Sequence, residues 1–364
     1  MSKVAILNDS HFGYKNSAEL FLDYQRDFYH KVFFPYCEKH GITRILHLGD
    51  IFDNRKHISI KALNFVRTQF LEEIRARGMH MDIIPGNHDT AYKNTIDLSS
   101  MFEILRYYDD CTSVHMKPTI VSIDGLKIGM VPWIAADNRD ECLDFIETSQ
   151  ADILGGHFQI GGFKLIANSS IKAEGLSKKV FSRYDMVLSG HFHTKSSQNN
   201  IIYLGSQYQF NWSDVDDNKY FHVLDTKTRD LDPILNPDKI YTKYYYDETD
   251  IADISEYLRK QKFAKSKIEG KYVRVVVKKK TNLYNFDLFI QHIKDRAPHD
   301  LTIIENFEEM NPGEITDDES ATIEDTTTLL NNYIDDHLLT HLNKDRLKNK
   351  LHELYIEASI EGTV

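Results

Sequence analysis

Residues that can bind a metal ion follow five short hydrophobic runs in this chain. The runs lead into Asp9 and His11, Asp50, Asn87, His157, and His191 and His193. Because the carboxyl ends of the strands in an open α/β sheet point into one crevice, we expect these side chains to meet there. Carboxylate and amide oxygens together with imidazole nitrogens are typical of a two-metal hydrolytic centre.

The spacing of these residues divides them between two ions. Alternate residues of an extended segment face the same way, so each Asp-x-His or His-x-His pair offers two ligands on one side. An aspartate with two oxygens can bridge two cations, and we expect this of Asp50. One predicted ion is held by Asp9, His11, Asp50 and His193. The other is held by Asp50, Asn87, His157 and His191.

Two cations about 3.5–4 Å apart can hold the attacking and the leaving oxygens of an in-line displacement at phosphorus. His88 directly follows a predicted ligand, and we expect it to be catalytic together with Asp50. It would protonate the leaving oxygen or stabilise the charge that develops at phosphorus. Mixed oxygen and nitrogen ligation without thiolates favours two Mn²⁺ ions over Mg²⁺, Fe²⁺ or Zn²⁺.

Each motif alone also has an ordinary structural explanation. A single Asp-x-His is usually a surface or capping pair, and Gly-Asn-His-Asp can be a turn. His47 is more often a packed or exposed histidine than a ligand. Five ligand groups, each after a hydrophobic run, favour the metal centre over these explanations.

Length and composition predict a globular protein of two or three units, with 364 residues and 41% hydrophobic content. No apolar stretch reaches bilayer length, and the first residues lack the pattern of a signal peptide. Three widely spaced cysteines argue against a disulfide framework and for a reducing compartment. We therefore expect a cytoplasmic protein with no membrane partner.

The formal net charge of −11 lies in the last part of the chain. Residues 301–364 hold 15 acidic and 4 basic residues, so the first 300 residues carry no net charge. Composition therefore neither supports nor excludes a DNA substrate.

Residues 1–235 alternate strand-like and helix-like segments, which predicts a layered α/β domain. Helices are expected at 17–40, 58–77 and 98–108. Asp124-Gly125 predicts a hairpin.

Residues 236–308 read as a small β-α-β-α-β domain, and 309–327 as an acidic flexible linker. Residues 328–361 predict two amphipathic helices that dock on a partner. Their apolar stripes are Leu330, Ile334 and Leu338, and Leu347, Leu351, Leu354 and Tyr355.

The metal motifs carry a family resemblance. Asp9-x-His11, Gly49-Asp50-Ile51-Phe52-Asp53, Gly86-Asn87-His88-Asp89 and Gly190-His191-x-His193 are similar to the signature of calcineurin-like metallophosphoesterases. The forms Asp-Ser-His-Phe-Gly and Gly-Asp-Ile-Phe-Asp resemble the DNA-repair nuclease branch of the SbcD and meiotic-recombination-eleven type. Size and tail resemble the compact endonuclease subunits of tailed phages. The motifs cover residues 1–230.

This resemblance implies a four-layer α/β/β/α sandwich with a small α+β capping domain. It implies a Mn²⁺-dependent nuclease, an exonuclease on duplex ends and an endonuclease on single strands. It further implies a homodimer that joins two copies of an SbcC-type coiled-coil ABC ATPase in double-strand break processing, recombination and replication. Asp53 and Asp89 would support the ligands. Archaeal and eukaryotic relatives carry a histidine at the position of Asp53, so no role of that histidine carries over.

Two surfaces are predicted beyond the metals. DNA contacts are expected from Lys15, Arg55, Lys56, Lys178, Lys179, Lys278, Lys279 and Lys280, although clusters of charge are usually just solvated faces. Dimer contacts are expected from Leu63, Val66, Phe70, Met101, Phe102 and Leu105, although such stripes usually face their own core.

Two other functions are compatible with the motifs. A phosphatase or phosphodiesterase for small substrates would share the site, but it leaves the small domain and the docking helices unexplained. A non-catalytic scaffold of the same fold usually loses ligands, whereas this chain keeps every expected one.

Overall fold

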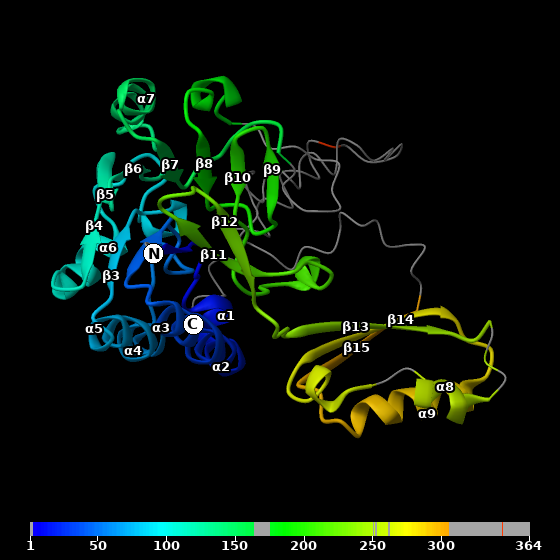
Figure 1. The fold of residues 1–364 in the computed structure, drawn as a ribbon. Coiled ribbons are helices and arrows are strands. Elements are labelled where there is room, and N and C mark those ends of the chain that lie inside the picture. The colour runs from blue at the N-terminus through cyan, green and yellow to red at the C-terminus, as the bar shows by residue number, and fades with distance from the viewer. Residues whose placement is uncertain are drawn as a thin grey trace. The chain divides into compact units, whose positions relative to one another are not determined.

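The structure is a computed structural model that describes residues 3–163, 175–249, 251, 253–260, 263–305 and 344. The predicted linker and the predicted partner-binding residues, from Leu330 to Tyr355, lie outside the described residues. The described chain contains two six-stranded sheets and one three-stranded sheet (Figure 1). In these residues, no helix has the length and apolar character needed to cross a membrane.

The first sheet has a parallel centre and an antiparallel edge. Its order is β12-β11-β1-β2-β3-β4. The parallel strands are β1 (Lys3–Leu7), β2 (Arg44–His47), β3 (His80–Ile83) and β4 (Thr112–Val114), and the antiparallel ones are β11 (Tyr220–Asp225) and β12 (Leu231–Leu235). The register pairs Val4 with Arg44 and Arg44 with His80, so β1, β2 and β3 end at the same edge.

The second sheet has the order β5-β6-β7-β8-β10-β9. Its strands are β5 (Thr119–Ile123), β6 (Leu126–Val131), β7 (Ile153–Gly156), β8 (Met186–Ser189), β10 (Ile201–Tyr203) and β9 (Ser196–Gln198). β6, β7, β8 and β10 run parallel. Asp124 and Gly125 join β5 to β6 with φ values of 50° and 89°, which confirms the predicted hairpin.

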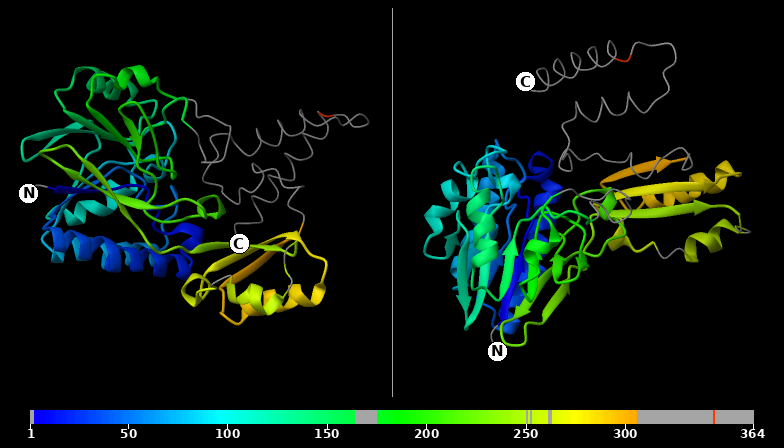
Figure 2. Two further views of the ribbon diagram at one scale, coloured as in Figure 1. Left: turned by 45° about the vertical axis from the view of Figure 1, so that its right-hand side comes forward. Right: turned by 90° about the horizontal axis from the view of Figure 1, so that it is seen from above.

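Three hydrophobic cores separate four layers. In β1, Val4 and Ile6 face the second sheet, while Ala5 and Leu7 face the helices. This is the alternation expected of a strand that is buried on both faces. Helix α7 (Arg139–Thr148) covers the outer face of the second sheet and packs Cys142 and Ile146 on it. The α/β/β/α sandwich is therefore confirmed (Figures 1 and 2).

Two predicted helices each contain a π-helical turn. The first runs as α2 (Glu19–Phe28), the π turn η1 (Tyr29–Phe33) and α3 (Phe34–His40), after the short α1 (Tyr14–Ser17). The second runs as α4 (Ile60–Val66), the π turn η2 (Arg67–Leu71) and α5 (Glu72–Ala76). The third predicted helix is α6 (Ser100–Leu105), followed by the 3₁₀ turn η4 (Arg106–Tyr108).

The three-stranded sheet has the predicted order of elements. It consists of β13 (Tyr241–Asp247), α8 (Ile254–Lys260), β14 (Tyr272–Lys279), α9 (Leu283–Lys294) and β15 (Asp300–Ile304), with all three strands parallel. Val273, Val275 and Val277 share one hydrophobic core with Phe289 and Ile293 of α9. The alternation in β14 therefore buries one face of the strand against the helices, as expected.

Contacts tie this three-stranded unit to the sandwich. Gln209 Oε1 accepts hydrogen bonds from the backbone N–H groups of Ile240 and Tyr241, each at 3.0 Å. The Arg274 guanidinium lies 3.9 Å from the ring centroid of Trp212.

Candidate metal centre

The predicted ligands gather at the carboxyl ends of five parallel strands. Asp9 and His11 follow β1, Asp50 follows β2 and Asn87 follows β3; His157 follows β7, and His191 and His193 follow β8. Contacts join the two sheets at this edge. The backbone N–H of His191 lies 3.1 Å from both carboxylate oxygens of Asp9, and His157 Nδ1 donates to the carbonyl of Leu48 at 2.8 Å.

One half of the cluster contains the ligands predicted for the first ion. His11 Nε2 lies 3.1 Å from His193 Nε2, and each nitrogen lies 3.9 Å from Asp9 Oδ1. His11 Nε2 also lies 3.7 Å from Asp50 Oδ2. The ligand atoms of Asp9, His11 and His193 all lie within 4.8 Å of one another, close enough to share a single cation.

The other half contains the ligands predicted for the second ion. Asn87 Oδ1 lies 2.9 Å from His157 Nε2 and 2.9 Å from His191 Nδ1. His157 Nε2 lies 3.2 Å from Asp50 Oδ2. Asp50 Oδ2 is therefore near a histidine of each half, which is the position of a bridging ligand.

The buried carboxylates of this cluster require positive charge nearby. Asp9 and Asp50 are almost fully buried. Within the described residues, the ion pairs at 4.0 Å or less that involve them are all with histidines. Buried carboxylates need nearby positive charge, since desolvation is costly. His191 Nε2 is also buried without a hydrogen-bond partner. The donor set therefore fits divalent metal ions.

The electrostatics of the two carboxylates differ. Burial raises the pKa of Asp9. Burial alone would also raise the pKa of Asp50, but His157, His88 and His11 outweigh it and hold that pKa well below its ordinary value. Asp50 is thus the more firmly ionised of the two, which suits a bridging ligand.

The pKa values of the two histidines in each half are shifted in opposite directions. Burial lowers the pKa of His191 to about 3 and that of His193 well below its ordinary value. For His157, burial acts in the same direction, but Asp50 outweighs it and raises the pKa to about 9. For His11, burial is likewise outweighed, by Asp53 and Asp50, which raise the pKa to about 9. Without a bound ion, the nearby carboxylates thus favour the protonated form of His11 and His157, and a metal ion at either site would displace that proton.

Several of these residues have left-handed backbone. The φ values are 48° at Asp9, 42° at His11, 56° at Asp50 and 88° at His191. Such a conformation costs a residue with a side chain about 1–3 kcal/mol and persists only where the surroundings hold it. The strain therefore concentrates at the turns that aim the candidate ligands.

Two glycines allow these turns to approach each other. A Cβ on Gly86 would lie 2.2 Å from Asp50 Oδ1, and a Cβ on Gly49 would lie 2.7 Å from the Cα of Gly86. A side chain at either position would push the motifs apart.

Asp89 holds the turn that carries Asp50. Its Oδ2 accepts from the backbone N–H groups of Asp50 at 2.7 Å and Gly86 at 2.9 Å. Its Oδ1 accepts from Ile51 at 3.0 Å and Phe52 at 3.2 Å. Burial and the charge of Asp50 raise the pKa of Asp89 to about 7. Asp89 thus links the second and third motifs through their backbone N–H groups.

Asp53 and His88 lie beside the first half. Asp53 Oδ1 lies 3.4 Å from His11 Nδ1, and the Asp53 carbonyl accepts from His88 Nδ1 at 2.5 Å. Because Nδ1 is the donor, the neutral His88 ring carries its free lone pair on Nε2. Burial lowers the pKa of His88. The His88 ring stands at 83° to the His11 ring, with centroids 4.8 Å apart.

Two aromatic residues that sequence reasoning missed line the halves. The Phe210 ring packs against His11 and His193, with centroids 5.0 and 4.9 Å apart. The Trp133 ring packs against His157 and His191, at 6.0 and 5.3 Å. Trp133 follows β6 just as the ligands follow their strands. This position after a hydrophobic run could have identified Trp133 from the sequence.

The predicted DNA contacts differ in their surroundings. Lys56, Lys179, Lys278 and Lys279 are exposed, and Lys15 is exposed with its ammonium 5.2 Å from the ring centroid of Tyr272. The remaining three have partners or burial of their own. Lys178 donates to Gln198, Lys280 pairs with Glu305 at 2.7 Å, and Arg55 is partly buried.

The predicted dimer surface needs a correction. Val66, Phe70, Met101 and Leu105 are fully buried in the chain's own hydrophobic core, so they cannot form a surface. Leu63 and Phe102 are 38% and 47% exposed. Exposed neighbours on the same helices and adjoining turns are Ile60, Leu98 and Tyr107. The helical period identified the apolar residues of these helices, but it did not show which of them are exposed at the surface.

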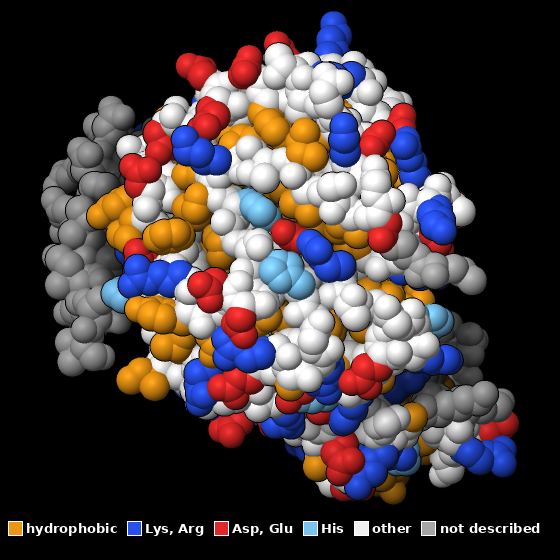
Figure 3. Space-filling model, turned by 60° about the vertical axis from the view of Figure 1, so that its left-hand side comes forward, with side chains coloured by type: hydrophobic (Ala, Val, Ile, Leu, Met, Phe, Trp, Pro, Cys, Tyr) orange, Lys and Arg blue, Asp and Glu red, His pale blue; other side chains and the backbone are white. Residues whose placement is uncertain are grey.

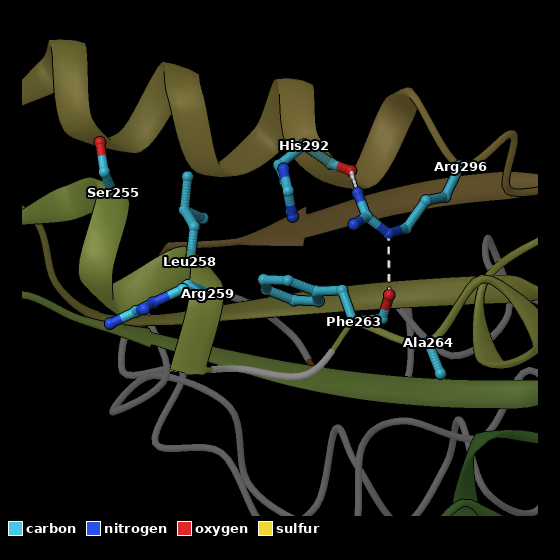
Figure 4. Close-up of a pocket in the computed structure, with 7 residues that line it drawn as sticks. All are labelled: Ser255, Leu258, Arg259, Phe263, Ala264, His292 and Arg296. Carbon is cyan, nitrogen blue, oxygen red and sulfur yellow. Dashed lines mark hydrogen bonds between the residues drawn. The ribbon is translucent and has the colours of Figure 1, made fainter.

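The metal centre is distinct from a cavity elsewhere in the chain. Histidine side chains reach the surface on the face shown in Figure 3, with acidic and basic side chains beside them. A cavity of about 670 Å³ lies elsewhere, between α8 and α9 (Figure 4). There Arg296 donates to the carbonyls of Phe263 and His292, at 2.9 and 2.5 Å. The residues lining this cavity include no carboxylate, so it lacks the ligands of the metal centre.

Comparison with known proteins places the chain in a family. The calcineurin-like phosphoesterase model matches residues 2–195. The chain belongs to this family, whose members depend on a pair of metal ions. The "Exonuclease subunit 1" of Enterobacteria phage T4 is 30% identical over 359 residues, which are 98% of this chain and 99% of that protein. The protein is a metal-dependent phosphodiesterase of the nuclease type.

Two further matches cover less of the chain. One component of the SbcCD nuclease of Staphylococcus epidermidis is 30% identical over 168 residues, 43% of this chain and 41% of that protein. A solved structure described as a novel archaeal phosphodiesterase is 12% identical, with a TM-score of 0.33, over 64% of this chain and 99% of that one.

Proposed function

We propose that the chain is a Mn²⁺-dependent DNA nuclease subunit, an exonuclease on duplex ends and an endonuclease on single strands. Asp9, His11, Asp50 and His193 hold one ion; Asp50, Asn87, His157 and His191 hold the other. Bound ions supply charge stabilisation and an activated water for attack at phosphorus. The oxygen and nitrogen donor set, without thiolates among the described residues at the centre, favours Mn²⁺.

One observation carries this proposal. Asp50 Oδ2 lies 3.7 Å from His11 Nε2 and 3.2 Å from His157 Nε2, so one carboxylate oxygen faces both halves of the cluster. A carboxylate in this position would be able to contribute to both ions. Asp89 and the glycines at 49 and 86 fix this carboxylate in place.

His88 is the proposed proton donor to the leaving oxygen. The carbonyl of Asp53 orients its ring through Nδ1, which reserves Nε2 for the substrate. When the ring is protonated, Nε2 carries the proton that it can give to the leaving oxygen.

The test is degradation of an end-labelled DNA duplex in Mn²⁺ by the wild-type chain and by His88→Asn. Loss of a general acid should lower the rate about 10²- to 10⁴-fold with Mn²⁺ binding retained. A matched control is His40→Asn, because His40 is exposed at the end of α3. Equal rates for wild type and His88→Asn would contradict the catalytic role.

Residues 236–308 are the proposed capping domain that helps to bind DNA. The exposed lysines at 278 and 279 lie at the end of the strand β14, and Lys15 connects this unit to the first metal motif by its contact with Tyr272. Phosphate contacts predict an affinity for DNA that falls steeply with salt. An affinity that is indifferent to salt would count against this role.

A homodimer is the proposed assembly, through the exposed hydrophobic residues Ile60, Leu63, Leu98, Phe102 and Tyr107. Neighbouring exposed apolar side chains of this size are typical of a protein interface. Leu63→Asp with Phe102→Asp should sediment as a folded monomer. If this variant still sediments as a dimer, the proposed dimer surface is wrong.

An SbcC-type coiled-coil ABC ATPase is the proposed partner, in break processing in the cytoplasm. The amphipathic pattern of residues 328–361 and the names of the two nuclease relatives support this partner. Truncation after Glu309 should abolish co-purification with the ATPase and retain Mn²⁺-dependent hydrolysis of a simple phosphodiester. Retained co-purification would refute the docking role.

A further inference from the structure

The residue between Asp9 and His11 lies in a buried hydrogen-bond network. Ser10 is fully buried. Its hydroxyl oxygen lies 2.8 Å from His47 Nε2 and 3.0 Å from the Tyr29 hydroxyl, and it receives a hydrogen bond from Gln207 Nε2 at 3.1 Å. Three side chains therefore surround one hydroxyl group.

The Ser10 carbonyl is held as firmly as the hydroxyl. It accepts from Gln25 Nε2 at 3.0 Å and from the Tyr208 hydroxyl. Gln25 Nε2 also lies 3.1 Å from the Tyr208 hydroxyl and 3.4 Å from the His11 carbonyl. The peptide bond that leads from Ser10 into His11 is thus fixed by two side chains.

The backbone at this point needs such support. Asp9 and His11, on either side of Ser10, both have left-handed φ values. On one side, backbone hydrogen bonds to the second motif hold the turn, from Asp9 N to Gly49 O at 2.9 Å and from His11 N to Asp50 O at 3.0 Å. The Ser10 network holds it on the other side.

Outside the first motif, the network draws on three parts of the chain: one helix, the strand β2 and the segment between β10 and β11. Gln25 lies on α2, Tyr29 opens the π turn η1, His47 ends β2, and Gln207 and Tyr208 lie between β10 and β11. These hydrogen bonds couple the Asp9–His11 turn to the helix α2 and to the segment at 207–208. The network is therefore placed to govern where two candidate ligands point.

We propose that Ser10, with Gln25, Tyr29, His47, Gln207 and Tyr208, is a positioning network that sets Asp9 and His11 for metal binding. This inference rests on the proposed function, because it assigns the same two residues to an ion. All six residues are fully buried, so they act through the two ligands.

A network that only filled a polar gap in the core would support stability alone. The chain offers a matched example of that kind. The Tyr184 hydroxyl lies 2.9 Å from Ser149 Oγ and donates to the Ile146 carbonyl at 2.7 Å, buried beside α7 and in contact with none of the candidate ligands through these bonds. Tyr184→Phe is therefore the control for Tyr208→Phe.

The experiment is titration of the full chain with Mn²⁺, followed by calorimetry and by the electron paramagnetic resonance signal of the ion, with thermal unfolding in parallel. Ser10→Ala and Tyr208→Phe should each weaken Mn²⁺ binding about 10- to 100-fold, as is typical when partners of metal ligands are removed. Tyr184→Phe should lower the melting temperature and keep the affinity and the resonance signal of wild type.

Each outcome bears on a different claim. Unchanged Mn²⁺ affinity in Ser10→Ala and Tyr208→Phe, with normal binding by wild type, overturns the positioning network alone. A wild-type chain that binds no Mn²⁺ overturns the proposed function, and the network falls with it. If Ser10→Ala does not fold, Tyr208→Phe decides the matter, because it removes a single hydroxyl.

Discussion

Around the candidate metal centre the chain buries polar side chains, whereas the three-stranded unit at 241–304 buries hydrophobic ones. Asp9, Asp50, Asp89 and His157 are all buried in the sandwich, each with hydrogen-bond or ion-pair partners. The buried residues among the described part of the small unit are all valine, isoleucine, phenylalanine and tyrosine. A hydrophobic contact tolerates small shifts, but a buried polar group that loses its partner costs the full desolvation penalty. Geometry should therefore matter far more at the metal centre.

The strongest test of this contrast uses two glycines with left-handed backbone. Gly49 has a φ of 93° and no room, since a Cβ would lie 2.7 Å from His157 Nδ1. Gly270 has a φ of 66° and nothing within 4 Å of such a Cβ. Gly49→Ala combines backbone strain with a clash and should cost about 3–5 kcal/mol. Gly270→Ala should cost about 1 kcal/mol.

Urea unfolding of the two variants provides the measurement. Metal binding should also be lost in Gly49→Ala, because the clash separates the turns that carry Asp50 and Asn87. Equal losses of stability in both variants would mean that packing at the centre is no tighter than in the small unit.

A second test compares two carboxylates that hold backbone N–H groups. Asp89 is buried and accepts from four of them; in Asp89→Asn, the amide NH₂ group would face two donors, which should cost about 3 kcal/mol. Glu248 is partly exposed and accepts from Thr281 and Asn282. Glu248→Gln keeps one oxygen and has water nearby, so its cost should stay within about 1 kcal/mol. Thermal unfolding of both variants measures the difference, and a reversed order would break the comparison.

The smallest expected effect is a pH dependence in the small unit. Burial alone would raise the pKa of Glu248, but hydrogen bonds from Tyr246 and Thr281 outweigh it and lower that pKa to about 2. A lowered acid pKa stabilises the fold above the ordinary value of 4.5, and this contribution is lost as the pH falls from there toward 2. Between pH 5 and 2, wild type should therefore lose slightly more stability than Glu248→Gln. If the stability of wild type and of Glu248→Gln falls equally with pH, Glu248 contributes nothing to the pH dependence.

The sequence predicted the elements of the small unit, but only the residues of the metal centre and not their backbone conformation. In the small unit, Val273, Val275 and Val277 carry the alternation of a strand, and the elements follow in the predicted order. At the centre, the strand-then-ligand pattern predicted which side chains converge. It did not predict the left-handed turns, because φ at Asp9 or His11 is set by contacts with distant segments rather than by local preference.

Other features left no sequence pattern to read. The π turns interrupt helices whose hydrophobic period continues across them, so 17–40 and 58–77 each read as one helix. Gln25 and Tyr208 look like ordinary surface residues until the fold buries them. The helix α7 is short, with apolar positions at Cys142, Leu143, Phe145 and Ile146, and it was not predicted.

The bonds that join the first and the last strands of the centre have a consequence for synthesis of the protein. Asp9 meets the backbone of His191, and His11 meets His193, each across 182 positions of the chain. A chain emerging from the ribosome has its first motif exposed long before the last one exists. Half-made molecules therefore lack the assembled cluster, and the candidate ligands form a complete set only after His193 has been translated.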